Sequence, residues 1–322
     1  MEDKTTPEKR TLMLLDGHSI FIRSFSGLMR QGLTAPDGSG TWGPYGAFNV
    51  IASLIRKHKP SHVLIAMDKG RSTKRLAIDP NYKANRDRKR DETKPMDHAF
   101  AVEFNPQLFT FIELCLRNGL PVIRIDGIEA DDIIATAALS LAPIFENVLI
   151  VSSDHDLHQL VRPNITVVKP SISYRDIEEE VHDMEFVKEQ WGVDPWRLPE
   201  IWALMGDKGD NIKGIPGIGP KKATKLIADH GDLETVLALD DPKISENVEV
   251  VRLAKRLIEL DVDDTIPFPP LGSLQFNPIK YGEKGTYELE QLYDSLGFVQ
   301  IKDRWKQDTL WKDVMPFGRK LH

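Results

Sequence analysis

Acidic side chains crowd into residues 126–133, whose sequence is DGIEADDI. The segment holds Asp126, Glu129, Asp131 and Asp132, and the apolar run that follows it is typical of a buried helix. Taken alone, Asp131 and Asp132 also fit a simpler role, since acids stabilise the N-terminus of a helix. Buried carboxylates repel one another unless cations neutralise them. The segment therefore raises the possibility of a metal site.

Other apolar runs in the first half of the chain also end in acid. The residues directly after them are Asp16, Asp68, and the pair Asp154 and Asp156. Any one of these fits a turn, but turns do not require acid after every run. Carboxylate oxygens suit hard ions, chiefly Mg²⁺ or Mn²⁺. A large acidic set can hold two such ions about 3.5–4 Å apart, the arrangement that hydrolyses phosphodiester bonds.

The apolar runs are the expected strands of one sheet. They cover residues 11–15, 62–67, 121–125, 147–152 and 165–169, and helical patterns lie between them at 47–58, 106–118 and 131–141. Alternating strands and helices predict a parallel sheet with helices on both faces. Because parallel strands all end at the same edge, the seven carboxylates that follow them are expected to converge there.

The charge of the chain is segregated. The net charge of −7 argues against a polyanionic partner, yet residues 69–90 contain nine basic residues and only two acidic ones. The basic residues are Lys69, Arg71, Lys74, Arg75, Lys83, Arg86, Arg88, Lys89 and Arg90. Such a run is usually a solvated surface, but this one begins beside Asp68. We expect Lys83 and Arg86 to lie over the metal site and to stabilise negative charge on a phosphate oxygen. Contacts with DNA are expected from Arg71, Lys74 and Arg75.

A second acidic pair precedes a glycine-rich loop. Asp207 and Asp210 are three residues apart, which would place them on one side of a helical turn. The sequence GIPGIG follows at 214–219, and a helix is expected to begin at Pro220. Its free N–H groups, together with Gly217, Gly219, Lys221 and Lys222, suit a phosphate of a nucleic-acid backbone. The alternative is a plain helix–turn–helix with solvated lysines.

The last third of the chain is expected to be mostly helical, and the segment LEQLYDSLGF at 289–298 is one of its helices. We divide the chain into a flexible terminus (1–10), an α/β domain (11–190), a helical DNA-binding region (191–306) and a tail (307–322). The single cysteine, Cys115, can form no internal disulfide and suits a reducing compartment. The sequence has no signal peptide or membrane-spanning run, so a cytoplasmic protein without a membrane partner is expected.

Eight pieces of the sequence occur in a recognisable order over about residues 11–306. They are LLDGHS, YGAFN, AMDKG, NYKANR, GIEADDIIAT, SSDHDLHQLV, ALMGDKGDNIKGIPGIGPKKA and LEQLYDSLGF. With them the chain resembles the 5′-nuclease family, which includes the 5′→3′ exonuclease domain of bacterial DNA polymerase I and bacteriophage flap endonucleases. No polymerase domain follows, so the chain looks like a stand-alone member.

The resemblance implies a fold and a set of site residues. The fold is an α/β, Rossmann-like (PIN-like) and mostly parallel sheet flanked by helices, with a helical arch at about 70–105 and a C-terminal helix–hairpin–helix variant. The family's acidic metal ligands match Asp16, Asp68, Glu129, Asp131, Asp132, Asp154, Asp156, Asp207 and Asp210. Its arch lysine and arginine match Lys83 and Arg86. Its K⁺ site, made of backbone carbonyls, would fall near Leu204, Met205, Lys213, Ile215 and Ile218.

The resemblance also implies an activity. We expect a monomeric, Mg²⁺- or Mn²⁺-dependent nuclease that cuts DNA at 5′ flaps, nicks or single-stranded 5′ ends during replication or repair. Two other interpretations remain open. One is a related nuclease that removes RNA primers from RNA–DNA hybrids, and the other is a protein that binds branched DNA without cutting it.

Overall fold

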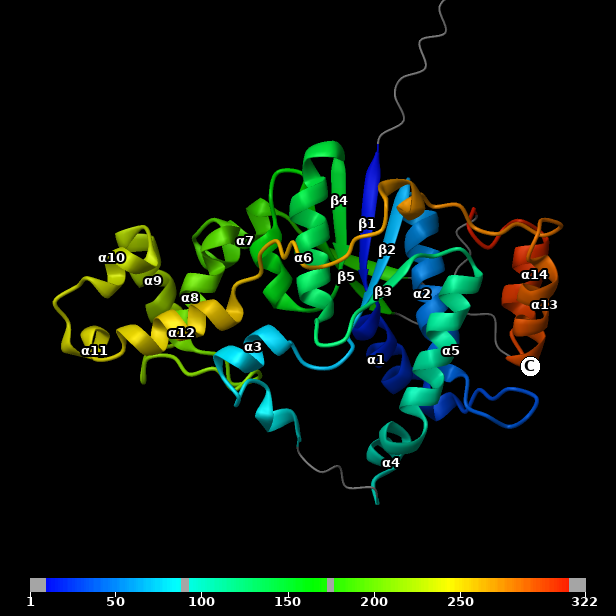
Figure 1. Cartoon of the computed structure of the whole chain (residues 1–322), viewed down its shortest axis with the longest axis horizontal. Helices are drawn as coiled ribbons and strands as arrows, with labels where there is room; N and C mark the ends of the chain where they lie inside the picture. Colours follow the sequence, from blue (N-terminus) through cyan, green and yellow to red (C-terminus); the bar gives the residue numbers. More distant parts are fainter. Residues whose placement is uncertain (1–9, 88–92, 173–176, 313–322) are drawn as a thin grey trace, which may run out of the picture.

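The computed structural model describes residues 10–87, 93–172 and 177–312. The basic residues Arg88, Lys89 and Arg90, most of the expected N-terminal extension and the end of the tail lie outside these ranges. One mixed sheet organises the structure (Figure 1). Its strands are β1 (Thr11–Asp16), β2 (His62–Met67), β3 (Val122–Arg124), β4 (Asn147–Val151), β5 (Ile165–Ile172) and β6 (Ile177–His182).

The strand order is β3-β2-β1-β4-β5-β6, and every neighbouring pair is parallel except β5 and β6. This confirms the expected fold class. The sequence did not predict β6, because its residues IEEEVH lack an apolar alternation. Charge is common on an edge strand, and here Glu179 accepts hydrogen bonds from the side chain of His58 and forms an ion pair with Lys57 at 2.8 Å.

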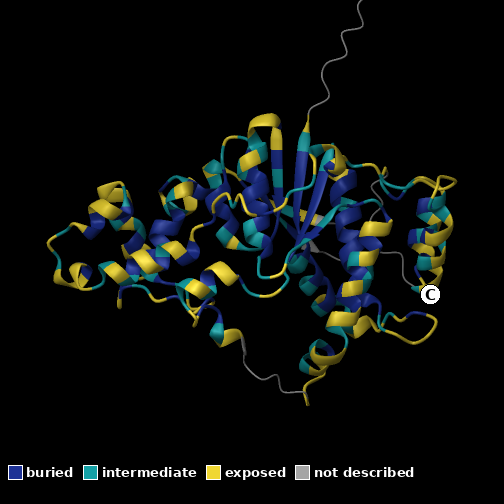
Figure 2. Ribbon diagram, viewed as in Figure 1, coloured by how far each residue is buried: buried dark blue, intermediate teal, exposed yellow. Residues whose placement is uncertain are grey.

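Alternate residues of the strands supply two hydrophobic cores, one on each face of the sheet. Leu12 and Leu14 pack on the side of α6 (Ala130–Leu141), whereas Met13 and Leu15 pack on the side of α1 (Gly17–Leu28), α2 (Trp42–His58) and α5 (Phe104–Arg117). Period-two alternation between two apolar faces is what a sheet covered on both sides requires. Figure 2 shows the central strands β1 and β2 almost entirely buried, with exposed residues on the outward sides of the helices.

The helices after the sheet divide between the two ends of the molecule (Figure 1). The first core extends into α7 (Met184–Trp191), α8 (Leu198–Met205), α9 (Pro220–His230), α10 (Leu233–Leu237), α11 (Pro242–Ser245) and α12 (Val248–Ile258). The second core includes α13 (Thr286–Ser295) and α14 (Val299–Lys306). Residues 191–306, expected to form one helical region, therefore lie partly beside the glycine loop and partly against α2 and α5. No helix among the described residues is long and apolar enough to cross a membrane.

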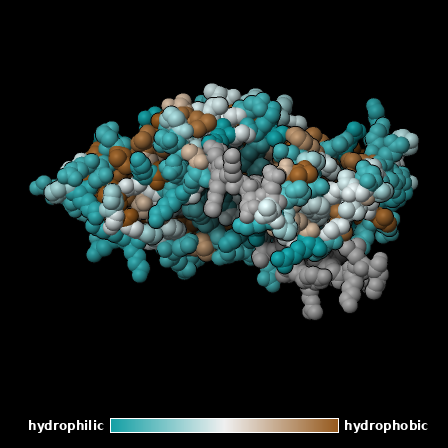
Figure 3. All heavy atoms as spheres, turned by 90° about the horizontal axis from the view of Figure 1, so that it is seen from below, coloured by the Kyte–Doolittle hydropathy of each residue, from teal (hydrophilic) through white to brown (hydrophobic). Residues whose placement is uncertain are grey.

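Short helices flank the carboxyl edge of the sheet. They are α3 (Thr73–Ile78), the 3₁₀ helix η2 (Ala84–Asp87), α4 (Pro95–Val102) and the 3₁₀ helix η4 (His155–Leu160). In Figure 1 this edge faces downwards, with α3 on one side and α4 on the other. Seen from below, hydrophilic residues cover most of the molecule, with separate hydrophobic patches among them (Figure 3). Of the segment 70–105, the described helices α3 and α4 thus flank this edge on opposite sides.

Candidate active site

The ends of β1 and β4 are joined by a buried aspartate. Asp16 caps α1, since one carboxylate oxygen accepts the backbone N–H of Ser19 at 2.9 Å. Its other oxygen accepts the hydroxyl of Ser152, which follows β4, at 2.7 Å. The Ser152 oxygen in turn accepts the backbone N–H of Asp154 at 3.0 Å. Two acids from separate strands are therefore held side by side through one serine.

The end of β2 is tied to the start of α6. Asp68 accepts the backbone N–H of Ala130 at 2.7 Å, a bond that spans 62 residues of sequence. The ring of His18 lies 3.9 Å from the other oxygen of Asp68. This contact fixes the segment DGIEADDI against the sheet and brings Glu129 and Asp131 to the same edge as Asp16.

The pKa values of these carboxylates reflect both their burial and their mutual repulsion. Burial, together with the charges of Asp68 and Asp154, raises the pKa of Asp16 to about 7, although hydrogen bonds from Ser152 and Ser19 oppose the shift. Burial likewise raises the pKa of Asp131 well above its usual value, with added repulsion from Asp154, Asp16 and Asp68. Of the seven carboxylates predicted to converge, Asp16, Asp68, Asp131 and Asp154 are therefore close enough to affect one another's charge.

A second acidic group adjoins the first. Carboxylate oxygens of Asp156, Asp207 and Asp210 lie within 4.8 Å of one another. Burial, together with the charges of acidic neighbours such as Asp154 and Asp207, raises the pKa of Asp156 to about 7, although the charge of His155 opposes the shift. The ring of His155 lies 3.3 Å from Asp156 and stands edge-on to the Trp202 indole. This second cluster draws one member from the end of β4 and two from the loop after α8.

The expectation that Asp207 and Asp210 share a helical turn is wrong. They belong to a tight loop closed by a bridge between Asp207 and Ile212, with Asn211 at φ +61°. A side-chain oxygen of Asp207 accepts the N–H of Gly209 at 2.6 Å, which competes with helix formation. The loop nevertheless places both carboxylates together, so the three-residue spacing was informative although the assumed conformation was not.

Basic residues cover the acids from the side of η2. The Lys83 ammonium lies 2.8 Å from Glu129 and 3.6 Å from Asp210, and Arg86 also pairs with Asp210. Burial would lower the pKa of Lys83, but the charges of Glu129 and Asp210 raise it above its usual value. The Lys83 backbone adopts φ +55° and donates to the Asp210 carbonyl at 2.9 Å. Lys83 is therefore a charged group that a specific backbone conformation holds at the acidic edge.

Arg75 occupies a different place from the one expected. Its guanidinium binds both oxygens of Asp132, at 2.7 and 2.8 Å, and also contacts Glu129 at 3.2 Å and the Leu257 carbonyl at 2.8 Å. Arg75 is 6% exposed, so a direct contact with DNA does not fit its burial. Asp132, expected to be a metal ligand, has both oxygens committed to this pair. By contrast, Lys74 on the same helix is exposed, and its ammonium lies 4.0 Å from Asp263.

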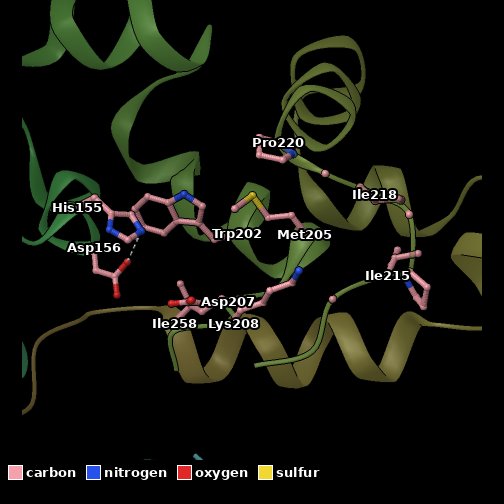
Figure 4. A pocket seen from close by; sticks show the side chains of 15 residues that line it. His155, Asp156, Trp202, Met205, Asp207, Lys208, Ile215, Ile218, Pro220 and Ile258 are labelled. Carbon is pink, nitrogen blue, oxygen red and sulfur yellow. Dashed lines mark ion pairs between the residues drawn. The ribbon is translucent and has the colours of Figure 1, made fainter. Parts of the chain in front are cut away.

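The glycine loop, residues 214–219, lines a cavity of about 630 Å³ that opens beside Asp156 and Asp207. Figure 4 shows Trp202, Met205, Ile215, Ile218 and Pro220 around it, with His155 and Asp156 on one side. A side chain at Gly214 would meet the backbone of Met205 and Gly206 at 2.2–2.3 Å, so only glycine fits there. The loop is thereby pressed against the end of α8 and lies next to the acids.

Several of the residues expected to bind DNA or K⁺ lie around this loop. Lys221 and Lys222 are exposed in the first turn of α9, whose N-cap is Gly219, and Gly217 adopts φ +76°. The carbonyls of Leu204 and Ile215 already accept backbone N–H groups, from Ile215 at 2.9 Å and Ile218 at 3.0 Å. The carbonyls expected near a cation therefore belong to one compact backbone turn. Met205 and Lys213 flank the two glycines, Gly206 and Gly214, that close it.

The donor chemistry fits hard divalent cations. Within the described part of the chain, both groups of side chains that could share an ion consist of carboxylates, with His155 in one of them. Such oxygen-rich sets suit Mg²⁺ or Mn²⁺ rather than copper or structural zinc. Burial, and to a lesser extent repulsion among neighbouring carboxylates, raises the pKa values of Asp16 and Asp156. Cations would relieve that repulsion.

Sequence patterns missed four residues around the site. Tyr82 donates its hydroxyl to Glu129 at 3.0 Å and lies under the Lys83 ammonium, 4.9 Å from the ring centroid. Its position beside Lys83 in NYKANR was an available signal. Ser152 and Arg124 carried no sequence signal, because each depends on a contact across the sheet. Lys243 also carried no sequence signal, because it reaches the glycine loop from a later segment. Its ammonium lies 2.9 Å from the position that a Cβ atom would take at Gly217.

Comparison with known proteins agrees with this geometry. Residues 11–192 match the family model "5′-3′ exonuclease, N-terminal resolvase-like domain", and residues 193–281 match "5′-3′ exonuclease, C-terminal SAM fold". A 5′-3′ exonuclease of Aquifex aeolicus is 35% identical over 228 residues, covering 71% of this chain and 72% of that protein. DNA polymerase I of Mycobacterium tuberculosis is 32% identical over 313 residues, covering 94% of this chain. The chain spans about a third of the length of that polymerase (32%).

Solved structures show the same fold at lower identity. The T5 5′-exonuclease with bound zinc ions has a TM-score of 0.66 at 22% identity, covering 94% of this chain and 98% of the other. The T5 flap endonuclease in a complex with DNA and metal ions has a TM-score of 0.65 at 22% identity, with the same coverage. The catalytic core of Rad2 in complex with DNA has a TM-score of 0.56 at 17% identity, covering 94% of this chain and 93% of the other.

Proposed function

The chain belongs to the 5′-3′ exonuclease family and is a nuclease, and we propose that it is a structure-selective enzyme that cleaves DNA at 5′ flaps, nicks and single-stranded 5′ ends. The observation that carries this proposal is the convergence of acids from β1, β2, β4 and α6 on one edge, next to Lys83 and the glycine loop. Replication and repair are the processes that produce such substrates.

We propose two divalent cations, Mg²⁺ or Mn²⁺, as cofactors. The group of Asp16, Asp68, Glu129, Asp131 and Asp154 would hold one, and the group of Asp156, Asp207 and Asp210 would hold the other. When bound, such ions supply an activated water and neutralise charge on the phosphate. Divalent metal ions bound to the T5 enzyme support a metal-dependent site in general. Asp132 would act indirectly, by holding Arg75 against Glu129.

The basic side chains at the acidic edge would act on the substrate. Lys83 and Arg86 now neutralise Glu129 and Asp210. A metal ion at those carboxylates would compete for them, leaving Lys83 to contact a non-bridging phosphate oxygen and stabilise its developing charge. The φ of +55° at Lys83 and its backbone bond to Asp210 would keep the ammonium near the scissile phosphate.

The glycine loop would bind the duplex through the phosphates of the DNA backbone. The N-terminus of α9, with Lys221 and Lys222, offers N–H groups and positive charge to a phosphate, and Lys243 adds a third ammonium. A K⁺ ion held by carbonyls of the turn at 204–218 would strengthen that grip. Such contacts read no base sequence. In this proposal α8 to α12 position the DNA, while the sheet with α13 and α14 forms the catalytic part of a monomer.

Product mapping on a DNA duplex with a labelled 5′ flap tests the proposal. With Mg²⁺ the purified protein should release short 5′ fragments that end in a 3′-hydroxyl and leave a 5′-phosphate on the duplex, and EDTA should stop the reaction. Asp126→Asn is a matched control, because Asp126 is exposed and paired with Lys69. A flap that is shifted on a gel but stays intact would instead indicate a binding protein. Faster cleavage of an RNA flap than of a DNA flap would favour primer removal.

A further inference from the structure

Arg124 lies at the carboxyl edge beside the acids, on the strand farthest from the glycine loop. It ends β3 and pairs in register with Met67, the residue before Asp68. Its Nε donates to the backbone carbonyl of Asp68 at 3.0 Å. Because Ile123 points into the core on the α6 side, the alternation of the strand turns Arg124 towards α5.

An exposed aromatic ring on α5 meets this guanidinium. The guanidinium carbon of Arg124 lies 5.4 Å from the ring centroid of Phe109. Phe109 is 56% exposed, an unusual state for a phenylalanine next to a charged edge. Within the described ranges no carboxylate lies in ion-pair distance of Arg124, whereas the nearby Lys69 is paired with Asp126 at 2.7 Å. Arg124 therefore keeps its terminal N–H groups for an anion.

The order of the strands places this pair opposite the glycine loop. Along the edge come Arg124 (β3), Asp68 (β2), Asp16 (β1) and Asp154 (β4), and the cavity with Asp207 lies beyond β4. Figure 1 shows α5 and α9 on opposite sides of the strands. A strand that is held as duplex at the glycine loop and continues in the same direction across the acids reaches β3 next.

We propose that Arg124 and Phe109 form a subsite for the nucleotide of the departing 5′ single strand, the guanidinium binding its phosphate and the phenyl ring stacking on its base. This inference rests on the proposed function and adds a place for the flap strand. A planar guanidinium held by one N–H presents its remaining donors in a fixed orientation, which suits phosphate oxygens. An exposed ring stacks on any base, so the subsite needs no sequence preference.

The variants Arg124→Gln, Arg124→Lys and Phe109→Ala test the subsite. We expect Arg124→Gln and Phe109→Ala each to raise KM for a flap of five unpaired nucleotides by about tenfold, the scale of one stacked base. kcat should change much less, and a nicked duplex without a flap should be affected little. Log affinity falls as log salt concentration rises. In EDTA, Arg124→Gln should make this slope shallower by about 0.7, the value for one phosphate contact on a single strand. Arg124→Lys should keep that slope.

Arg117→Gln is the matched control, because Arg117 lies on α5, is exposed and pairs with Glu113 away from the edge. It should leave KM and the salt slope unchanged. Thermal unfolding of each variant separates a folding defect from a binding defect. The subsite would be refuted if flap and nick substrates lose affinity equally, or if Arg124→Gln keeps the wild-type slope. Failure of the wild-type protein to cut any flap would refute the proposed function instead, while the slope measured in EDTA would still test Arg124.

Discussion

Replacing Asp16 by asparagine should stabilise the metal-free protein at alkaline pH. Asp16 is 5% exposed, and burial together with neighbouring acids raises its pKa from 3.8 to about 7. Asparagine has nearly the same shape and is an equally good helix cap, so it can still accept the N–H of Ser19. The substitution therefore removes the charge while keeping the contact that starts α1.

The size of the effect follows from linkage between protonation and folding. The folded chain holds the Asp16 proton more tightly than the unfolded chain does. Its full contribution to stability is therefore present below about pH 3.8 and is lost as the pH rises through about 7. One pKa unit is about 1.4 kcal/mol, so ionised Asp16 costs roughly 4 kcal/mol at pH 8. Between pH 5 and pH 8 the same relation gives a loss of roughly 2–3 kcal/mol.

Urea denaturation in EDTA measures this directly. We expect Asp16→Asn to exceed the wild type in free energy of unfolding at pH 8 by up to roughly 4 kcal/mol, and by clearly less at pH 5. With Mg²⁺ at a hundred times its Kd the gap should narrow, because a ligand at that concentration stabilises the chain that binds it by about 2.7 kcal/mol.

Asp126→Asn is the control for this series. Its carboxylate lies in the same acidic segment, but its side chain is 80% exposed, and its replacement should change stability little at either pH. If metal-free Asp16→Asn is less stable than the wild type at pH 8, or if the gap does not widen between pH 5 and pH 8, then Asp16 is a structural residue and the acids do not strain the fold.

Three other substitutions test separate parts of the structure. Arg75→Leu should destabilise the protein by about 1–3 kcal/mol in urea, because it leaves the half-buried Asp132 without its partner; an unchanged midpoint would show that the ion pair does not stabilise the fold. Gly214→Ala should lower the melting temperature and weaken duplex binding, since its methyl group would meet Gly206 N at 2.2 Å; normal binding in an anisotropy titration would show that the loop can relax. Asp154→Asn should abolish cleavage of a labelled flap while leaving stability in EDTA unchanged or higher, and a clear loss of stability would mark Asp154 as structural.

The sequence alone predicted the fold class and most of the acidic residues at the carboxyl edge. Apolar runs followed by acid predicted β1, β2 and β4, and parallel strands must end at one edge, so the sequence predicted Asp16, Asp68 and Asp154 close together. Glycine spacing and two lysines likewise indicated the loop before α9. These signals are local, since each depends only on residues adjacent in the chain.

Other features depended on contacts between distant segments. Arg75 lies in a basic run that suggested a surface, yet its partner Asp132 is 57 residues away, and only the packing of α3 against α6 and α12 shows that it is buried. β6 contains three glutamates, and it forms a strand only because its backbone pairs with that of β5. Asp207 and Asp210 meet through a loop rather than a helix.

Residue type and spacing therefore determined which groups could do chemistry at the carboxyl edge. The tertiary structure decided which of those groups face the site and which neutralise each other inside the protein. The physical reason is that burial and ion pairing depend on neighbours in space: Arg75 and Lys83 have the same charge in the sequence, but one is enclosed with Asp132 and the other lies over Glu129 at the acidic edge.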